Sequence, residues 1–325
     1  MVRALALIAA LFSGPLLAAG LCGFPGRDGS VQAEGLVNLW LASAEQSLIE
    51  PGSRWLPVAA ARGRGELQPG DIALLIQMQG AQIVAANDDS YGDGVAGDGI
   101  ANGAQTMQAG HFEFVRIEEI EPGRVRVRSN GPNSGVMHRY RSQEPQAAAD
   151  QGRQRWQLVR VPQYENLTLS GALRTLPWDG RSGGVLALDV RRSLILNNQT
   201  LTVAGSGFRG AAALSLIGAL GDDRDYRYRA PGIAELAAAF GQHASKGEGL
   251  AGTPRWLASE ELALDSRPEA DRLVVSDGYP DGSMARGAPA NAGGGASSLS
   301  PDTRAPAGGG GGGGGGPAGA TGGEP

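Results

Sequence analysis

The chain has 325 residues, of which 41% are hydrophobic and 53 are glycine. Its formal charge at pH 7 is −5, and almost all of its basic residues are arginine because Lys246 is the only lysine. This balance does not provide the basic surface that a nucleic-acid-binding protein needs, so we expect no nucleic-acid partner. The length suffices for one large domain or two ordinary ones.

The first residues have the order of a secretory signal peptide. Arg3 is followed by an apolar run over residues 4–12, a Gly-Pro break and then small residues up to Gly20. The apolar run is too short to span a membrane. We therefore assign residues 1–20 to a signal peptide and expect an exported protein, secreted or at the cell surface, with no transmembrane segment after cleavage.

The next segments predict strands. Residues 21–50 lead into the body of the chain and contain the apolar stretch LVNLWLASA (36–44), which is compatible with a strand or a short helix. Residues 51–164 are predicted to form a β-rich N-terminal region. A strand is expected over 72–78, where the apolar run IALLIQM follows a Pro-Gly turn.

A β-hairpin is predicted within that region, over residues 111–129 (HFEFVRIEEIEPGRVRVRS). Charged residues are interleaved with apolar ones on the first strand, and Val125 and Val127 alternate with arginines on the second. Pro122 and Gly123 are typical turn residues, so the two strands are expected to pair around them.

Residues 165–210 predict several short strands, in NLTLSG, GGVLALDV, SLILNN and TLTVAGSGF. No amphipathic helix separates them, as βαβ units would require. Short strands joined by Gly and Asn turns fit a right-handed parallel β-helix. A β-sandwich is the alternative, although it would show cleaner alternation. The expected fold class is therefore mostly β, with the β-rich region leading into β-helix rungs.

The C-terminal third has fewer strands. Residues 211–288 predict a loop-rich region with a short helix over 233–244 and a candidate strand at RLVVSD (272–277). Residues 289–325 are a low-complexity tail that includes nine consecutive glycines, Gly308–Gly316. Such a tail cannot bury enough surface to offset its ordering entropy, so it is predicted to be disordered.

Several phrases in this order resemble a known module. The phrases are GLVNLWL (35–41), PGDIALLIQMQGAQI (69–83), SYGDGVAGDG (90–99), GHFEFVRI (110–117), LVRVPQY (158–164), GGVLALDV (183–190), GSGFRG (205–210), SKGEGLAGTPRWL (245–257) and ARGAPANAGGG (285–295). Together they resemble the N-terminal glycine-rich module of large exported bacterial surface proteins, which are adhesin-like and often carry immunoglobulin-like repeats of unknown function. The resemblance implies the N-terminal part of a larger surface protein, and it implies no reaction.

The best candidate metal site is the acidic loop NDDSYGDGVAGDG (87–99). Asp88, Asp89, Asp93 and Asp98 are interleaved with glycines that let carboxylates and carbonyls turn inward, as Ca²⁺ requires. The spacing matches neither the EF-hand nor the nonapeptide of calcium-binding β-rolls. The alternative is a solvated turn whose aspartates cap their own backbone. Calcium is the one cofactor that the sequence suggests.

Catalytic residues are not predicted. A carbohydrate-cleaving β-helix needs several carboxylates from neighbouring rungs, and the rungs offer only Asp189, with Asp179 in the loop before them. Asp189 could share a groove with Arg191 and Arg192, or it could occupy a rung corner where these arginines offset its charge.

The remaining candidate residues are interpreted as structural. The chain has no GxSxG motif, and its three histidines, His111, His138 and His243, have no motif around them. The tryptophans are expected in the core, with a sugar-binding face as the alternative: Trp156, Trp178 and Trp256.

The sequence thus favours a secreted or cell-surface structural or adhesion module without catalytic activity. Its partner would be an extracellular ligand or surface polymer of unknown identity. The alternatives are a carbohydrate-active β-helix enzyme and a calcium-dependent extracellular binding module.

Overall fold

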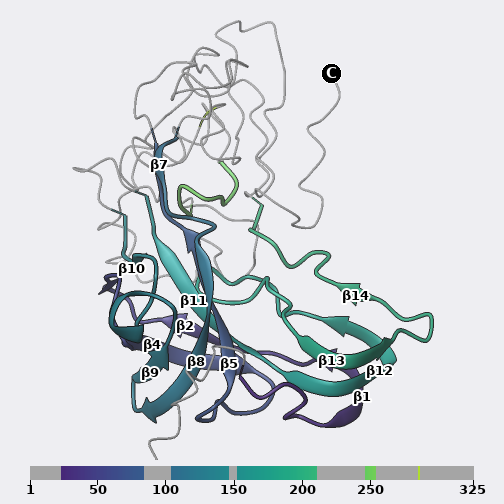
Figure 1. The fold of residues 1–325 in the computed structure, drawn as a ribbon. Coiled ribbons are helices and arrows are strands. Elements are labelled where there is room, and N and C mark those ends of the chain that lie inside the picture. Colours follow the sequence, from purple (N-terminus) through teal and green to yellow (C-terminus); the bar gives the residue numbers. More distant parts are fainter. Residues whose placement is uncertain (1–22, 84–103, 146–151, 211–245, 254–284, 286–325) are drawn as a thin grey trace, which may run out of the picture.

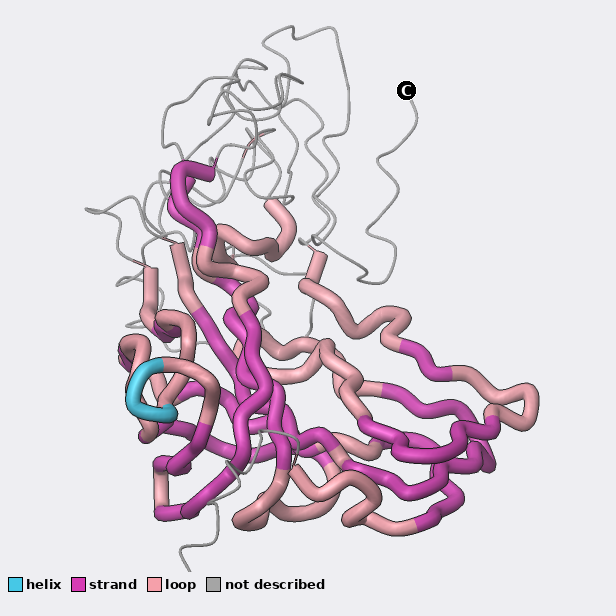
Figure 2. Tube along the Cα trace, viewed as in Figure 1, coloured by secondary structure: helices cyan, strands magenta, loops and turns pink. Residues whose placement is uncertain are grey.

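The computed structural model describes residues 23–83, 104–145, 152–210, 246–253 and 285 (Figure 1). These residues form fourteen strands and one short 3-10 helix, so the prediction of a mostly β fold is confirmed (Figure 2). The signal peptide, the acidic loop 87–99, the helix at 233–244 and the glycine tail fall outside the described residues, as does the candidate strand at 272–277.

The centre of the fold is a closed barrel of six antiparallel strands. The strands follow the order β11-β2-β4-β9-β8-β5 around the barrel. Their bounds are β2 (Leu39–Ser43), β4 (Trp55–Gly63), β5 (Ile72–Gln79), β8 (Phe112–Glu121), β9 (Arg124–Arg128) and β11 (Arg155–Val161). Closure leaves none of these strands with an unpaired edge along the barrel.

Two local predictions are confirmed in this barrel, and one open alternative is decided. The apolar run expected over 72–78 is β5, and the stretch at 36–44 contributes a strand, β2, and no helix. The hairpin is β8 and β9, which pair from Glu121↔Arg124 to Arg116↔Arg128 with a register shift between Ile117 and Glu119.

The barrel interior is filled by apolar side chains that alternate along the strands. Trp156, Leu158, Leu75 and Val127 are fully buried there, and Trp178 is buried against Phe208, so two of the expected core tryptophans are confirmed. Each fully buried aliphatic or aromatic side chain contributes about 1.5–3 kcal/mol to folding. This core holds the barrel strands that carry the surfaces described below.

A parallel sheet extends from the barrel, because only Pro162 separates β11 from the next strand (Figure 1). Its central strand is β12, which pairs in parallel with β1 on one side and with β13 and β14 on the other. The bounds are β1 (Ser30–Leu36), β12 (Gln163–Arg174), β13 (Asp189–Ile195) and β14 (Leu201–Thr202).

The expected β-helix is not shown. The parallel strands of residues 165–210 lie in a single sheet, whereas a β-helix stacks its rungs into two or more sheets around one coil. The stretch GGVLALDV is a strand only from Asp189 onward. Before that point, Nε1 of Trp40 donates to the carbonyl of Val185 and Nδ2 of Asn38 donates to that of Ala187. The carbonyls of Val185 and Ala187 are thus hydrogen-bonded by side chains and not by the backbone of a neighbouring strand.

Two smaller strand pairs and a short helix complete the described fold. They are β3 (Ser47–Ile49) with β10 (Tyr140–Ser142), β6 (Ala81–Ile83) with β7 (Ala104–Met107), and the 3-10 helix Pro132–Ser134. Within the described ranges, no helix has the length and apolar character needed to cross a membrane.

Candidate functional site

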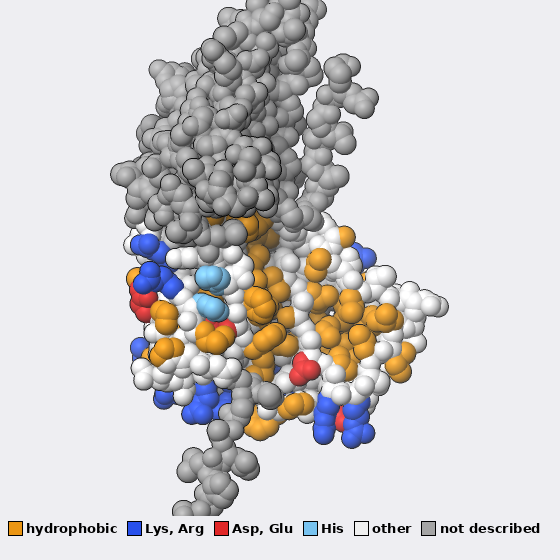
Figure 3. All heavy atoms as spheres, turned by 45° about the horizontal axis from the view of Figure 1, so that its top comes forward, with side chains coloured by type: hydrophobic (Ala, Val, Ile, Leu, Met, Phe, Trp, Pro, Cys, Tyr) orange, Lys and Arg blue, Asp and Glu red, His pale blue; other side chains and the backbone are white. Residues whose placement is uncertain are grey.

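A groove of about 630 Å³ is lined by residues of both the barrel and the loop that enters β13. Its walls include Phe112 and Phe114 from β8, Met137 from the loop before β10, and Leu188 and Asp189 from the start of β13. We call this the apolar groove. Figure 3 shows hydrophobic side chains gathered in bands over one face of the molecule, with histidine side chains beside them.

The apolar groove exposes large side chains that a soluble barrel would ordinarily bury. Phe112 is 55% exposed, Phe114 is 49% exposed and Met137 is 40% exposed. Burial alternates along β8, so Glu113 and Val115 are buried and point into the barrel. Exposed apolar patches of this kind commonly mark interaction sites.

Glu113 is the buried polar centre behind this wall and is only 2% exposed. Its carboxylate accepts hydrogen bonds from the backbone N–H of Met137 at 2.9 Å, from that of His138 at 3.2 Å, and from the hydroxyls of Tyr140 and Ser129. Burial raises the pKa of Tyr140 far above its ordinary value, and the Glu113 carboxylate raises it further. One side chain thus fixes the loop that carries Met137 against β8.

Sequence reasoning missed Glu113. It lies between two phenylalanines in an alternating strand, a pattern that gives no sign that the carboxylate faces inward. Its partners follow 16 to 27 residues later in the chain, so no local motif identifies them.

His111 and His138 lie next to each other beside this centre. Their rings are stacked with centroids 4.8 Å apart, and His138 also contacts the edge of Tyr140. Among the residues that the structure describes, no group of three or more His, Cys, Asp or Glu side chains is arranged to hold a metal ion.

The carboxylates considered from the sequence have separate surroundings. Asp189 accepts a 2.9 Å hydrogen bond from Nε2 of Gln163 at the edge of the apolar groove. The arginines expected to offset its charge, Arg191 and Arg192, instead pair with Glu165, so that interpretation is wrong. The reason is the parallel register, which places β13 beside β12.

The carboxylate of Asp179 is hydrogen-bonded to backbone groups of its own loop. It accepts from the backbone N–H groups of Arg181 and Ser182, both at 2.8 Å, and it pairs with Arg62. This is the self-capping geometry of an Asx turn.

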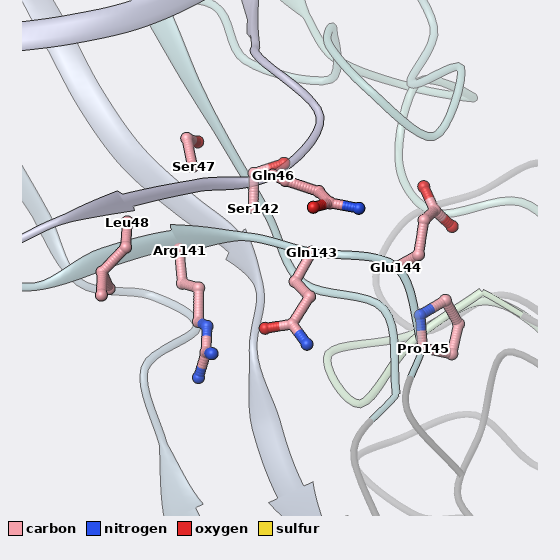
Figure 4. Close-up of a pocket in the computed structure, with 8 residues that line it drawn as sticks. All are labelled: Gln46, Ser47, Leu48, Arg141, Ser142, Gln143, Glu144 and Pro145. Atoms are coloured by element: carbon pink, nitrogen blue, oxygen red, sulfur yellow. The ribbon is translucent and has the colours of Figure 1, made fainter.

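A second hollow of about 470 Å³ lies where β3 and β10 meet (Figure 4). We call it the polar groove, and it is lined by Gln46, Leu48, Arg141, Gln143 and Glu144 together with neighbouring residues of the same two segments. Figure 4 shows Arg141 and Gln143 extending to the same side of their strand, with Leu48 beside Arg141.

Several of the phrases that carry the resemblance converge in space. Nε2 of Gln79 donates to the carbonyls of Gly249 and Gly252, at 3.1 and 2.9 Å. Arg209 makes two hydrogen bonds of 2.9 Å to the fully buried carboxylate of Glu248. The segment Lys246–Thr253 is therefore bound to the end of β5 and to the GFRG stretch, an arrangement that sequence reasoning did not predict.

The predicted calcium ligands Asp88, Asp89, Asp93 and Asp98 lie outside the described residues, so the calcium site stays a prediction. Comparison with protein-family models, with curated proteins and with solved structures found no match. The resemblance to the glycine-rich surface module therefore also stays a prediction.

Proposed function

We propose that this chain is a secreted or cell-surface structural or adhesion module without catalytic activity, which binds an extracellular ligand or surface polymer through the apolar groove. The observation that carries this proposal is the exposure of Phe112, Phe114 and Met137 on one wall of a concave surface.

The groove is well suited to binding because its wall is rigid before any ligand arrives. β8 pairs with a strand on each side, and the Glu113 carboxylate fixes the loop of Met137. Binding to such a wall loses little conformational entropy, so more of the apolar contact appears as affinity.

A binding assay with cell envelopes of the producing bacterium tests this proposal. The double variant Phe112→Ser/Phe114→Ser is expected to bind sedimented envelopes roughly tenfold more weakly than the natural chain, since exposed aromatic anchors dominate most interfaces. Ile120→Ser is the matched control, because Ile120 is exposed on the same strand but outside the groove. Equal binding by all three proteins would contradict the proposal.

A carbohydrate-active enzyme is the second candidate, and it is supported by the carboxylate of Asp189 in the groove lining, with the buried carboxylate of Glu113 behind the wall. Glu113 is held by several donors, which leaves Asp189 as the available group. This candidate requires new reducing ends to appear when the chain is incubated with a polysaccharide, and it requires Asp189→Asn to abolish them. If the natural chain produces no new reducing ends, the carbohydrate-active enzyme is ruled out as a candidate.

The finer fold prediction, a right-handed parallel β-helix, is also kept as a proposal. It is supported by the all-parallel pairing and by the register of β12 with β13, where Gln163 lies opposite Asp189, 26 positions later. An experimental structure with ordered residues after Gly210 would test it. Further strands stacked parallel to β13 would support the β-helix, and an uncovered β13 edge would count against it.

A further inference from the structure

The polar groove has donor groups without partners, beginning with Arg141. The backbone of Arg141 is fixed, because its N–H donates to Oε1 of Gln77 at 2.9 Å and its carbonyl accepts from Nε2 of Gln77 at 2.7 Å. Its guanidinium, in contrast, has no ion-pair partner among the described residues. An arginine that is held at its backbone, and whose guanidinium has no ion-pair partner in the described part of the chain, is prepared to bind an external carboxylate or phosphate.

Gln143 adds a second unpaired donor on the same side of β10 (Figure 4). Its Nε2 atom is buried and has no hydrogen-bond partner in the described structure, and Oε1 of the neighbouring Gln154 is in the same condition. The backbones of these two residues are joined by hydrogen bonds of 3.0 and 2.9 Å. A buried donor without a partner is unfavourable, so a rotation of the Gln143 side chain that brings Nε2 to an acceptor on a ligand would favour binding.

The charge around the polar groove favours an anion. The one carboxylate among the described lining residues, Glu144, is already paired with Arg153 and Arg155. Burial alone would raise the pKa of Glu144, but these two guanidinium groups lower it below its ordinary value, so the carboxylate stays ionised and occupied. Glu144 therefore does not compete for Arg141, which is the charged residue of the described lining that is left for an anion.

We propose that the polar groove binds a uronic-acid residue of an acidic polysaccharide. The guanidinium of Arg141 would pair with the sugar carboxylate, Nε2 of Gln143 would donate to the carboxylate or to a ring hydroxyl, and Leu48, which is 54% exposed, would pack on the ring. A hollow of about 470 Å³ lies in the range of roughly 300–1,000 Å³ that small-ligand sites occupy.

A polysaccharide fits this groove better than a nucleic acid. Among the lining residues that the structure describes, none is aromatic, so these residues offer no ring on which a base could stack. Side-chain amides beside a guanidinium match a carboxylate flanked by hydroxyl groups. The inference rests on the proposed function, since it names the chemical class of the surface polymer, but it places this ligand at a different surface.

Calorimetric titration of the full-length exported chain with oligomers of galacturonic acid tests the proposal. Binding is expected, and it should weaken as salt is added because an exposed ion pair is screened. Arg141→Met is expected to weaken binding by about tenfold or more. Arg139→Met is the matched control, since Arg139 is an exposed arginine two residues away that pairs with Glu50 outside the groove. Equal affinities for the two variants would overturn the proposal.

Two further ligands test whether binding requires the carboxylate and whether it requires a sugar. Methyl-esterified galacturonic-acid oligomers, which lack the charge, are expected not to bind, and poly-glutamate is expected to bind more weakly than the sugar. Equal binding of either one would overturn the proposal.

The two binding proposals can fail independently. The variant Phe112→Ser/Phe114→Ser should lose envelope binding and keep the affinity for galacturonic-acid oligomers. If envelope binding is absent in the natural chain while oligomer binding depends on Arg141, the proposed function fails and the present inference stands. If no oligomer binding is seen while envelope binding depends on Phe112 and Phe114, the inference fails alone.

Discussion

The hydroxyl of Tyr140 donates a 3.0 Å hydrogen bond to Oε1 of Glu113, and both side chains are buried in the barrel. This contact joins β10 to β8 across 27 positions of sequence. Together with the backbone N–H groups of Met137 and His138, it places one wall of the apolar groove. The loop of Met137 on the proposed binding surface is therefore held by a single interior carboxylate.

Glu113→Gln is expected to destabilise the fold by about 1–3 kcal/mol, because the amide supplies one acceptor oxygen in place of two and directs an NH₂ group toward other donors. Chemical denaturation measures this free energy. Glu119→Gln is the control, since Glu119 lies exposed on the same strand and pairs with Arg126 at 3.2 Å, an interaction worth at most about 1 kcal/mol. Equal losses for the two variants would show that Glu113 does not organise the loop.

Arg160 joins the barrel to the N-terminal turn. Its Nε donates to Asp71 at 3.0 Å and its Nη2 to Asp28 at 2.7 Å, and Asp28 also accepts from the backbone N–H of Gln163. Burial alone would lower the pKa of Arg160, yet these carboxylates raise it.

Arg160→Met should therefore cost about 1–3 kcal/mol in the free energy of unfolding. The buried Asp71 carboxylate would keep only Arg27 as an ion-pair partner, and the ion pair with Asp28 would be lost. Arg139→Met removes an exposed pair instead and should cost less than about 1 kcal/mol. Thermal or urea unfolding compares the two variants. A loss at Arg160 as small as that at Arg139 would mean that the network contributes little.

Stability should fall in acid. Burial acts to raise the pKa of Glu118, but hydrogen bonds and charge from Arg54 and Arg128 lower it below its ordinary value of 4.5, and Glu144 is lowered in the same way by Arg153 and Arg155. A carboxyl group whose pKa is lower in the folded state adds stability above its unfolded pKa. That stability is lost as the pH falls below 4.5 toward the folded value.

Melting temperatures measured from neutral pH down through this window check the sign. Glu118→Gln removes one of the two groups, so its melting temperature should fall less steeply with acid than that of the natural chain. A parallel fall in the two proteins would show that Glu118 does not contribute to the acid sensitivity.

The pair of Arg209 and Glu248 should protect the segment Lys246–Thr253 from proteolysis. Lys246 is fully buried, and its Nζ donates to the carbonyl of Ala285. Glu248→Gln should weaken the Arg209 contacts and accelerate tryptic cleavage after Lys246, as judged by mass spectrometry of the fragments. Glu45→Gln, which alters an exposed pair with Arg181, should leave that cleavage rate unchanged. Unchanged cleavage in Glu248→Gln would refute the role assigned to the pair.

The sequence predicted those elements whose cause is local. Pro122 and Gly123 make the hairpin turn, and the apolar run at 72–78 forms the buried strand β5. Barrel closure could not be predicted, because β11 pairs with both β2 and β5, strands that lie far earlier in the chain. No local pattern specifies which strands will meet over such distances.

The same reasoning explains the misjudged strand at 183–190. Its apolar residues suggested a β-helix rung over the whole stretch, but the side chains of Asn38 and Trp40 hydrogen-bond the carbonyls of Ala187 and Val185. Those donors lie 149 and 145 positions earlier in the chain. The candidate surfaces were missed for a related reason, because the walls of each groove combine residues from segments that are distant in sequence.

Fractionation of the producing cells tests the central claim, an exported binding module, most directly. An antibody raised against residues 50–290 should detect the protein in the medium or in the envelope fraction, and protease added to intact cells should degrade the envelope-bound form. A band of the mature size in the medium would indicate a free secreted protein, and a much larger envelope band would indicate the N-terminal part of a larger surface protein. Protein found only in the cytoplasm, and protected from added protease, would contradict the account.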